Sequence, residues 1–296
     1  MKNFINWILY NRGFSKWTAV NYKRSLVLFD EYLRKISFWK RGVKNAESIT
    51  LRDVESFIKM ERVKGKDVST CNNYIAGIRL YLKYCMVMWK DVIDYKRILT
   101  AREPHKKIEA LTDEEAKNLI DYFKSVPCET HREELVKTRN FMICRLLLYT
   151  GLRVNELSNL KIEDIKEELQ ILWKWWIRRV VYLFKEDLDI IDLYLFLRKD
   201  KSPYLLISHS SNSYWNKLSN VSIENIIREG WIKAWIEWNV FPHKLRHTFA
   251  TNLLRNWAKL PYIQQLLWHS NIQTTQTYLS VLNTDLKDSQ KLMKRY

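Results

Sequence analysis

Glycine is scarce in this chain of 296 residues, which contains only six. An ordinary protein has about 7% glycine, roughly three times this share. Tryptophan occurs 13 times, and the two residue types together come close to the share expected for glycine alone. The shortage of one and the excess of the other form an anomaly that composition by itself does not explain.

Cysteine is also sparse, and its spacing excludes several kinds of site. The four cysteines, Cys71, Cys85, Cys128 and Cys144, form no C-x-x-C pair and have no spacing typical of metal ligands. We therefore predict reduced thiols in the core of a cytosolic protein.

Long hydrophobic runs are missing as well. No run approaches the roughly 18 apolar residues that a membrane helix needs, and the opening segment, residues 4–10, is too short and too polar for a signal peptide. We expect a soluble, cytoplasmic protein without a membrane partner.

Two motifs of energy-dependent or metal-dependent chemistry are absent from the sequence. There is no G-x-x-x-x-G-K-[ST] loop, which argues against nucleotide hydrolysis. No carboxylate set has the character of a two-metal site, which argues against a metal-dependent nuclease or transposase. The expected chemistry uses no cofactor and no metal ion.

The charge of the chain is strongly positive and unevenly distributed. The net charge is +17, of which +11 falls within residues 1–100. Such a basic segment favours a polyanionic partner, although a merely soluble basic surface remains an alternative. The hydrophobic content of 47% is typical of a globular protein.

Helical periodicity dominates residues 1–98. Ser15 and Thr50 are expected to cap helices over residues 16–36 and 51–64, and Ser69 to open a third helix that reaches about Met88. Residues 99–109 are polar, contain Pro104 and lack periodicity. We interpret them as a linker between an N-terminal helical domain, residues 1–98, and a second domain, residues 110–296.

The second domain is predicted to be mainly α with a small β-sheet. Thr112 and Glu115 form a capping-box pattern, and a long apolar helix over residues 133–149 should stop at Gly151. Residues 171–172 and 179–183 favour the two strands of a hairpin, with residues 205–207 as a possible third strand. From Ser222 the periodicity is helical almost to the end.

A set of polar residues in the second domain suits phosphodiester chemistry. Arg153 follows the predicted end of a helix, and His243 and Arg246 lie three apart in a helix opened by Pro242, so they share a face. Two guanidiniums can clamp a phosphate that gains charge during reaction, and an imidazole can take or give a proton. Taken alone, Arg153 is better explained as a surface residue that caps the C-terminus of a helix, and H-x-x-R is a weak signal. His247 is expected to pack rather than react.

Three more side chains complete the set. Tyr278 is the proposed nucleophile, and its phenol needs nearby cations or a base because its reference pKa is near 10. His269 could hydrogen-bond a non-bridging oxygen, and Lys174, in the hairpin turn, could protonate a leaving 5′-oxygen. Each also has a structural explanation without a catalytic role. Tyr278 could be a half-buried aromatic residue, His269 a histidine at a helix end, and Lys174 a solvated lysine in a turn.

Together these segments resemble the tyrosine recombinase (phage integrase) family, and specifically its Xer site-specific recombinases. The resemblance runs through Tyr149-Thr-Gly-Leu-Arg-Val-Asn-Glu-Leu157, Phe241-Pro-His-Lys-Leu-Arg-His-Thr-Phe-Ala-Thr251 and Tyr262-Ile-Gln-Gln-Leu-Leu-Trp-His-Ser270. The ordered set R, K, H-x-x-R, H, Y is far more specific than any of its members.

The resemblance implies a function and a role for each residue of the set. Arg153, Lys174, His243, Arg246 and His269 match the activating residues of the family and Tyr278 its nucleophile, while Glu156 matches an acidic position that supports the site. It further implies an N-terminal core-binding (SAM-like) domain and an integrase-type catalytic domain that clamp double-stranded DNA. Four recombinase subunits, of one or two kinds, would join two recombination sites through a 3′-phosphotyrosyl intermediate.

The chain departs from this family pattern where tryptophan stands in place of glycine. The family usually has glycine at the positions of Trp173, Trp175, Trp257 and Trp268, and Trp238 falls in a normally glycine-rich approach to Pro242. We hypothesise that the source organism reads the codon UGA as glycine and that UGA was translated here as tryptophan. Literal tryptophans beside Lys174 would crowd the DNA that it must reach.

Several functions share these features. Resolution of chromosome dimers is favoured by the length and by the short tail after Tyr278, while integration of a phage or mobile element uses the same catalytic set. A catalytically silent DNA-binding protein would bind with a steep salt dependence and form no covalent adduct. A relaxing topoisomerase with the same nucleophile is disfavoured by the length and the two-domain plan.

Overall fold

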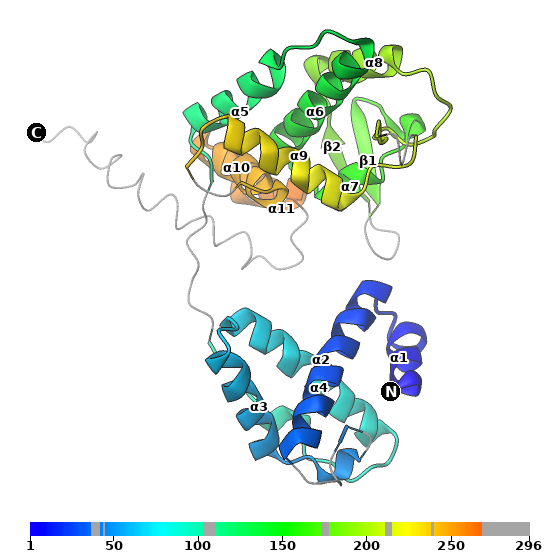
Figure 1. Cartoon of the computed structure of the whole chain (residues 1–296), viewed down its shortest axis with the longest axis vertical. Helices are drawn as coiled ribbons and strands as arrows, with labels where there is room; N and C mark the ends of the chain where they lie inside the picture. Colours follow the sequence, from blue (N-terminus) through cyan, green and yellow to red (C-terminus); the bar gives the residue numbers. More distant parts are fainter. Residues whose placement is uncertain are drawn as a thin grey trace, which may run out of the picture. The chain divides into compact units, whose positions relative to one another are not determined.

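The computed structural model of the chain describes residues 1–36, 42–43, 45–102, 110–172, 178–210, 215–237 and 240–267. The chain divides into two compact units, Met1–Lys106 and Lys107–Tyr296 (Figure 1). Each unit has its own apolar core. In the described residues, no helix is long and apolar enough to cross a membrane.

All the regular elements described in the N-terminal unit are helical. Its helices are α1 (Lys2–Asn6), α2 (Lys16–Ile36), α3 (Leu51–Val63) and α4 (Val68–Val87), with the short segments η1 (Trp7–Asn11), η2 (Ala46–Ser48) and η3 (Tyr95–Arg97). Phe4, Phe29 and Phe57 are fully buried and pack their rings against other aromatic side chains. These aromatic contacts join helices that are far apart in sequence.

Local capping accounts for where these helices begin. The Ser15 hydroxyl accepts the Thr18 N–H at the start of α2, and Thr50 forms a capping box with Asp53 at the start of α3. Both caps confirm the sequence prediction. The prediction was wrong for α4, which begins two residues earlier because the carboxylate of Asp67, rather than Ser69, accepts the Thr70 N–H.

The C-terminal unit packs its helices around α6. Its elements are α5 (Asp113–Ser125), α6 (His131–Thr150), α7 (Val154–Ser158), η4 (Ile162–Asp164), β1 (Glu168–Leu172), β2 (Arg178–Tyr182), α8 (Lys185–Leu197), α9 (Asn220–Lys233), α10 (Pro242–Arg255) and α11 (Leu260–Leu267). Met142, Ile143, Leu146 and Leu147 of α6 are fully buried. Helices α5, α8, α9 and α10 all pack against α6.

Strands β1 and β2 form an antiparallel hairpin in which Ile171 pairs with Arg179 and Leu169 with Val181. The predicted hairpin is therefore confirmed, and so is the fold class of mainly α with a small sheet. The predicted third strand is wrong in the described residues: Tyr204 and Ile207 make only isolated bridges, to Lys161 and Lys217. This segment pairs briefly with two loops instead of joining the hairpin.

The cysteine prediction holds for three of the four thiols. Cys71, Cys85 and Cys144 are buried, whereas Cys128 is exposed. Cys128 lies between α5 and α6, in a connection whose polar backbone groups need solvent, so the prediction of a core thiol was wrong there.

Four residues other than glycine have a left-handed backbone in the described residues, and all four are tryptophans. Their φ angles are 59° at Trp89, 66° at Trp215, 57° at Trp235 and 63° at Trp257. Left-handed backbone brings the Cβ of an L residue close to the following carbonyl oxygen, and a bulky residue there is an outlier. Glycine at Gly13, Gly65 and Gly151 has the same sign of φ without that cost.

Candidate active site

Three of the six predicted catalytic residues lie within the described structure. They are Arg153, His243 and Arg246, which come from the start of α7 and from α10. Lys174, His269 and Tyr278 lie outside the described residues.

Arg153 is placed by the turn that ends α6. Gly151 closes this helix with φ 62°, and a Cβ there would lie only 2.5 Å from the ring of Phe249 on α10. A side chain at this point would therefore force α6 and α10 apart. Helices α6 and α10 therefore lie in close contact. Arg153 follows the end of α6 by three residues, so it lies near the helix that carries His243 and Arg246.

Glu156 holds Arg153 at both its backbone and its side chain. The Arg153 N–H donates to Oε2 of Glu156 at 2.8 Å, and Nη1 of Arg153 donates to Oε1 at 2.9 Å. This reciprocal contact caps α7 and limits the rotamers of the guanidinium. The acidic position suggested by the family resemblance thus contacts the predicted arginine directly.

Arg246 is buried despite its charge, with 2% of its surface exposed. Pro242 occupies the first turn of α10 and starts the helix, and Arg246 follows one turn later. Its guanidinium donates to the backbone carbonyls of Gly151 and Leu267. These bonds link the end of α6 to the end of α11 through one side chain.

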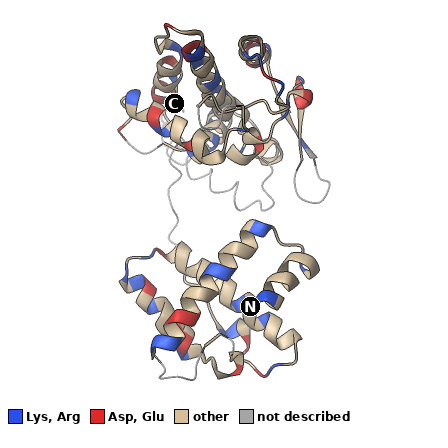
Figure 2. Ribbon diagram, turned by 45° about the vertical axis from the view of Figure 1, so that its right-hand side comes forward, with Lys and Arg blue, Asp and Glu red and all other residues tan. Residues whose placement is uncertain are grey.

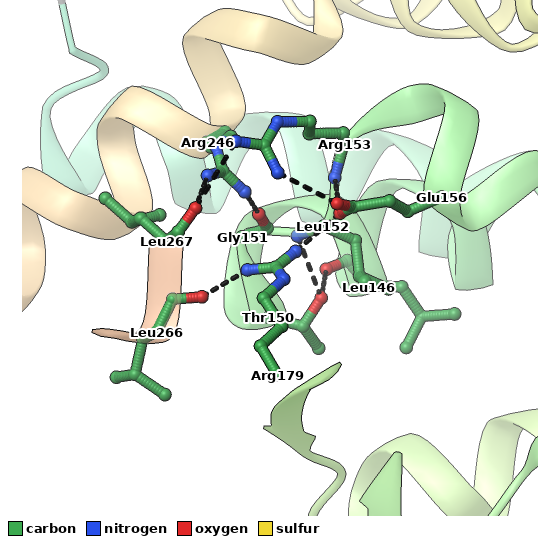
Figure 3. A network of polar contacts seen from close by, with 10 residues as sticks. All are labelled: Leu146, Thr150, Gly151, Leu152, Arg153, Glu156, Arg179, Arg246, Leu266 and Leu267. Atoms are coloured by element: carbon green, nitrogen blue, oxygen red, sulfur yellow. Dashed lines mark hydrogen bonds and ion pairs between the residues drawn. The ribbon is translucent and has the colours of Figure 1, made fainter. Parts of the chain in front are cut away.

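The two predicted arginines converge on a single oxygen atom (Figure 3). The carbonyl of Leu267 accepts from Nη2 of Arg246 and, at 3.5 Å, from Nη2 of Arg153. Residues that are far apart in sequence therefore aim their donors at one place.

A third arginine, Arg179 of β2, belongs to the same cluster and was missed by the sequence reasoning. Its side chain is 1% exposed and forms an ion pair with Oε2 of Glu156 at 2.5 Å. It also donates to the carbonyl of Leu266 (Figure 3). We call Arg153, Glu156, Arg179 and Arg246 the arginine cluster.

A sequence signal for Arg179 existed. Val181 and Leu183 are buried and lie two and four residues beyond it, so strand alternation places Arg179 on the same inward face. A charged side chain on an inward face requires a partner, and that requirement indicates a polar site.

Electrostatics keep Glu156 ionised. Burial acts to raise its pKa, but the charge of Arg179, together with the hydrogen bonds and charge of Arg153, outweighs burial and holds the pKa below its usual value. The carboxylate therefore stays charged throughout the neutral range.

The surroundings of His243 favour the neutral form of its ring. Partial burial of its ring, and then the charges of Arg246 and Arg153, lower its pKa. The ring stacks edge-on against His247, with 4.5 Å between centroids. A neutral imidazole has one nitrogen that can accept a proton, as general base chemistry requires.

The geometry can now be compared with known proteins. The model of the phage integrase family matches residues 109–284, and that of the phage integrase N-terminal SAM-like domain matches residues 1–87. The chain belongs to the phage integrase family. Its mainly helical fold with a SAM-like and an integrase-type domain agrees with the prediction from sequence.

Relatives within the phage integrase family cover almost the whole chain. A tyrosine recombinase XerA from Pyrococcus horikoshii is 31% identical over 273 residues, which cover 90% of this chain and 86% of the relative. A tyrosine recombinase XerD from Listeria monocytogenes is 27% identical over 311 residues, covering 98% and 97%. The prediction of a Xer-type tyrosine recombinase, an enzyme that cuts and rejoins DNA at specific sites, is confirmed.

Solved structures share the fold. A crystal structure of a XerA recombinase covers 100% of this chain and 98% of its own with 27% identity and a TM-score of 0.53. A XerH recombinase bound to its palindromic difH substrate after cleavage has 21% identity and a TM-score of 0.75, covering 94% of this chain and 80% of its own. At that identity the second comparison concerns the fold alone.

Proposed function

We propose that the chain recombines two DNA sites through a covalent bond between Tyr278 and a 3′-phosphate, with Arg153 and Arg246 holding the scissile phosphate. The convergence of both guanidiniums on one oxygen atom carries this proposal. A phosphate oxygen that takes the place of the Leu267 carbonyl would receive hydrogen bonds from two cations at once.

The proposed reaction conserves the number of phosphate ester bonds. The Tyr278 oxygen attacks phosphorus, the bond to the 5′-oxygen breaks, and Lys174 gives that oxygen a proton. A 5′-hydroxyl from the partner duplex then attacks the phosphotyrosine and releases Tyr278. Because each step exchanges one ester for another, no nucleotide hydrolysis is needed.

His243 and His269 have separate proposed tasks. His243, whose neutral form is favoured by burial and the nearby cations, is suited to accept the proton of the attacking phenol. His269 follows α11 by two residues and is proposed to hydrogen-bond a non-bridging oxygen. These roles rest on the order of residues shared with the family as well as on the geometry of His243.

The N-terminal domain, residues 1–98, is proposed to bind the recombination site, with 99–109 as linker and 110–296 as the catalytic domain. Lys and Arg are spread over several helices of the N-terminal unit (Figure 2). A groove on α2 and α4 is lined by Arg24, Lys66, Asn21 and Asn73, alongside Trp17. Cations, amides and an exposed ring are the groups that contact phosphates and base edges.

The biological role that we propose is resolution of chromosome dimers in the cytoplasm before cell division, by a tetramer of one or two kinds of recombinase subunit. The similarity of the chain to Xer recombinases over nearly its full length supports this role. Integration of a mobile element would use the same chemistry at a different pair of sites.

A nicked suicide substrate tests the proposal. The 5′-fragment diffuses away after cleavage, so the protein remains attached to DNA and migrates as a larger species on a denaturing gel. Because tryptophans beside Lys174 would crowd the DNA, the test uses the chain with Trp173→Gly, Trp175→Gly and Trp268→Gly. We expect the adduct with this chain and none when Tyr278→Phe is added, while site binding is unchanged. An adduct with Tyr278→Phe refutes the nucleophile, and site binding without any adduct identifies a silent DNA-binding protein.

A further inference from the structure

Arg179 joins Glu156 to the end of α11 from a third element, strand β2. One end of its guanidinium contacts Glu156, which fixes Arg153, and the other contacts the carbonyl of Leu266 at the end of α11. Two residues after α11 comes His269. Arg179 therefore touches the supports of two proposed phosphate ligands.

We propose that Arg179 is a positioning residue for cleavage, which acts through Glu156 on Arg153 and through α11 on the segment that carries His269. This proposal rests on the proposed function. A planar guanidinium with several fixed donors can hold a carboxylate and a carbonyl in one geometry, whereas a lysine ammonium is a flexible point charge.

The first test compares cleavage with binding. In single-turnover cleavage of the suicide substrate at saturating protein, Arg179→Met should lower the rate on the order of tenfold to a hundredfold, because a shift of about 1 Å in a reacting group has effects of this size. The affinity for the site should not change. Arg179→Lys, which keeps the charge, should recover part of the rate.

The matched control is Arg198→Met. Arg198 is also buried and paired with a carboxylate, that of Asp200. Its guanidinium also donates to the carbonyls of Tyr204, Leu205 and Ser202, which lie outside the arginine cluster. This variant should lose stability and keep its cleavage rate. If Arg179→Met weakens binding and cleavage equally, or cleaves as fast as the parent chain, the positioning role is wrong.

A second readout needs no catalysis. Arg179→Met takes away a charge that lowers the pKa of Glu156, so the loss of stability at acid pH should be smaller in Arg179→Met than in the parent chain. Arg179→Lys, which keeps the charge, should stay closer to the parent chain, and Glu156→Gln should lack the part of the loss that is due to this carboxyl. An unchanged acid profile overturns the link between Arg179 and Glu156. Absence of an adduct with the chain that carries Trp173→Gly, Trp175→Gly and Trp268→Gly refutes the proposed function instead.

A second inference rests on the backbone alone and is independent of function. Helices α3, α4, α9 and α10 end in the same way. The two N–H groups that follow the C-cap residue bond back to two carbonyls near the end of the helix. The pairs are Gly65 and Lys66 to Arg62 and Glu61, Trp89 and Lys90 to Met86 and Cys85, Trp235 and Ile236 to Ile232 and Trp231, and Trp257 and Ala258 to Leu254 and Leu253.

This paired pattern requires a left-handed residue directly after the C-cap residue of the helix, and glycine is the usual one. Helix α3 has Gly65 there, with φ 84°, while α4, α9 and α10 have tryptophan. Burial does not explain the tryptophans, since their exposed fractions are 98% at Trp89, 91% at Trp235 and 86% at Trp257. These exposed indoles make no core contacts that could offset the strain of the backbone.

We infer that glycine is the native residue at positions 89, 215, 235 and 257, and that the gene has UGA codons there which its organism reads as glycine. Three of these positions, 89, 215 and 235, are identified by the backbone alone. Position 257 is identified both by its backbone and by the family pattern Asn-Gly-Ala.

The gene and the natural protein give the direct test. We expect UGA at the four codons, and peptides from cells of the source organism that have the mass of glycine at these positions. UGG at any of the four codons overturns the inference for that position.

Stability measurements separate backbone strain from loss of the indole. Trp89→Gly, Trp235→Gly and Trp257→Gly should each raise the midpoint of thermal unfolding, and Trp→Ala at the same positions should raise it less, because alanine keeps the left-handed strain. Trp17→Gly is the control, since Trp17 is exposed but lies within α2, and it should lower the midpoint. Equal midpoints for the glycine and alanine variants contradict the inference.

Discussion

The residues of the arginine cluster suit their surroundings, whereas the tryptophans at the helix ends do not. In the cluster, charged side chains lie in the interior, yet both terminal nitrogens of Arg179 and of Arg246 donate to oxygen acceptors and Glu156 is held by two arginines. At the ends of α4, α9 and α10, large apolar side chains lie in solvent on a backbone that suits glycine.

The difference teaches which features of the chain the fold explains. Each unusual residue of the cluster is matched by a partner contributed from another element, so its type is accounted for by contacts. Each unusual residue at the helix ends is accounted for by nothing in its surroundings. Changes in the cluster should therefore alter catalysis, and changes at the helix ends should alter stability.

The largest effect is expected from Arg246→Ala. Removing a donor aimed at a developing negative charge lowers the rate by about 10²–10³-fold in enzymes where this has been measured. We expect a loss of this size in single-turnover cleavage. Arg255→Ala, an exposed arginine in the last turn of the same helix, should cleave normally, and a similar loss in both variants would contradict the role of Arg246.

An intermediate effect is expected from Gly65→Trp, which copies the tryptophan-bearing ends onto α3. Nothing lies within 4 Å of a Cβ added there, so only the backbone opposes the change. Left-handed backbone costs an L residue about 1–2 kcal/mol, and chemical denaturation should show this loss in the free energy of unfolding. Cleavage by the folded variant should be unchanged. A variant as stable as the parent chain would contradict the idea that tryptophan is costly at a left-handed helix end.

The smallest effect is expected from pH. The pKa of Glu156 is lowered by folding, so its contribution to stability is complete above the ordinary carboxyl pKa of about 4.3 and is lost as the pH falls through the lower folded value. Unfolding measured at a series of pH values below 5 should show this loss in the parent chain. Glu156→Gln should show a shallower dependence, and an identical dependence would argue against the lowered pKa.

Local signals in the sequence predicted the elements well. The capping box of Thr112 and Glu115, the hydroxyl cap of Ser15 and the end of α6 at Gly151 all depend on residues within four positions of one another, and each is confirmed. The start of α4 shows the limit of this reasoning, because Asp67 and Ser69 are both good caps and only the geometry chooses between them.

Features that depend on distant residues were harder to predict. The segment around Tyr204 and Ile207 has the composition of a strand, but its partners are loops, which composition does not reveal. Strand alternation places Arg179 on an inward face but does not name its partners, Glu156 and Leu266, which lie on other elements. The family resemblance supplied Arg153 and Arg246 because it encodes such distant contacts.

The arginine cluster also has a simple charge count. Three guanidiniums and the single carboxylate of Glu156 leave a surplus of two positive charges among these four side chains. A phosphodiester under attack by a phenolate carries two negative charges, one from each reactant. The two surplus positive charges of the cluster therefore equal the two negative charges of the reacting group. Bound DNA would neutralise the charge that the protein itself leaves unpaired.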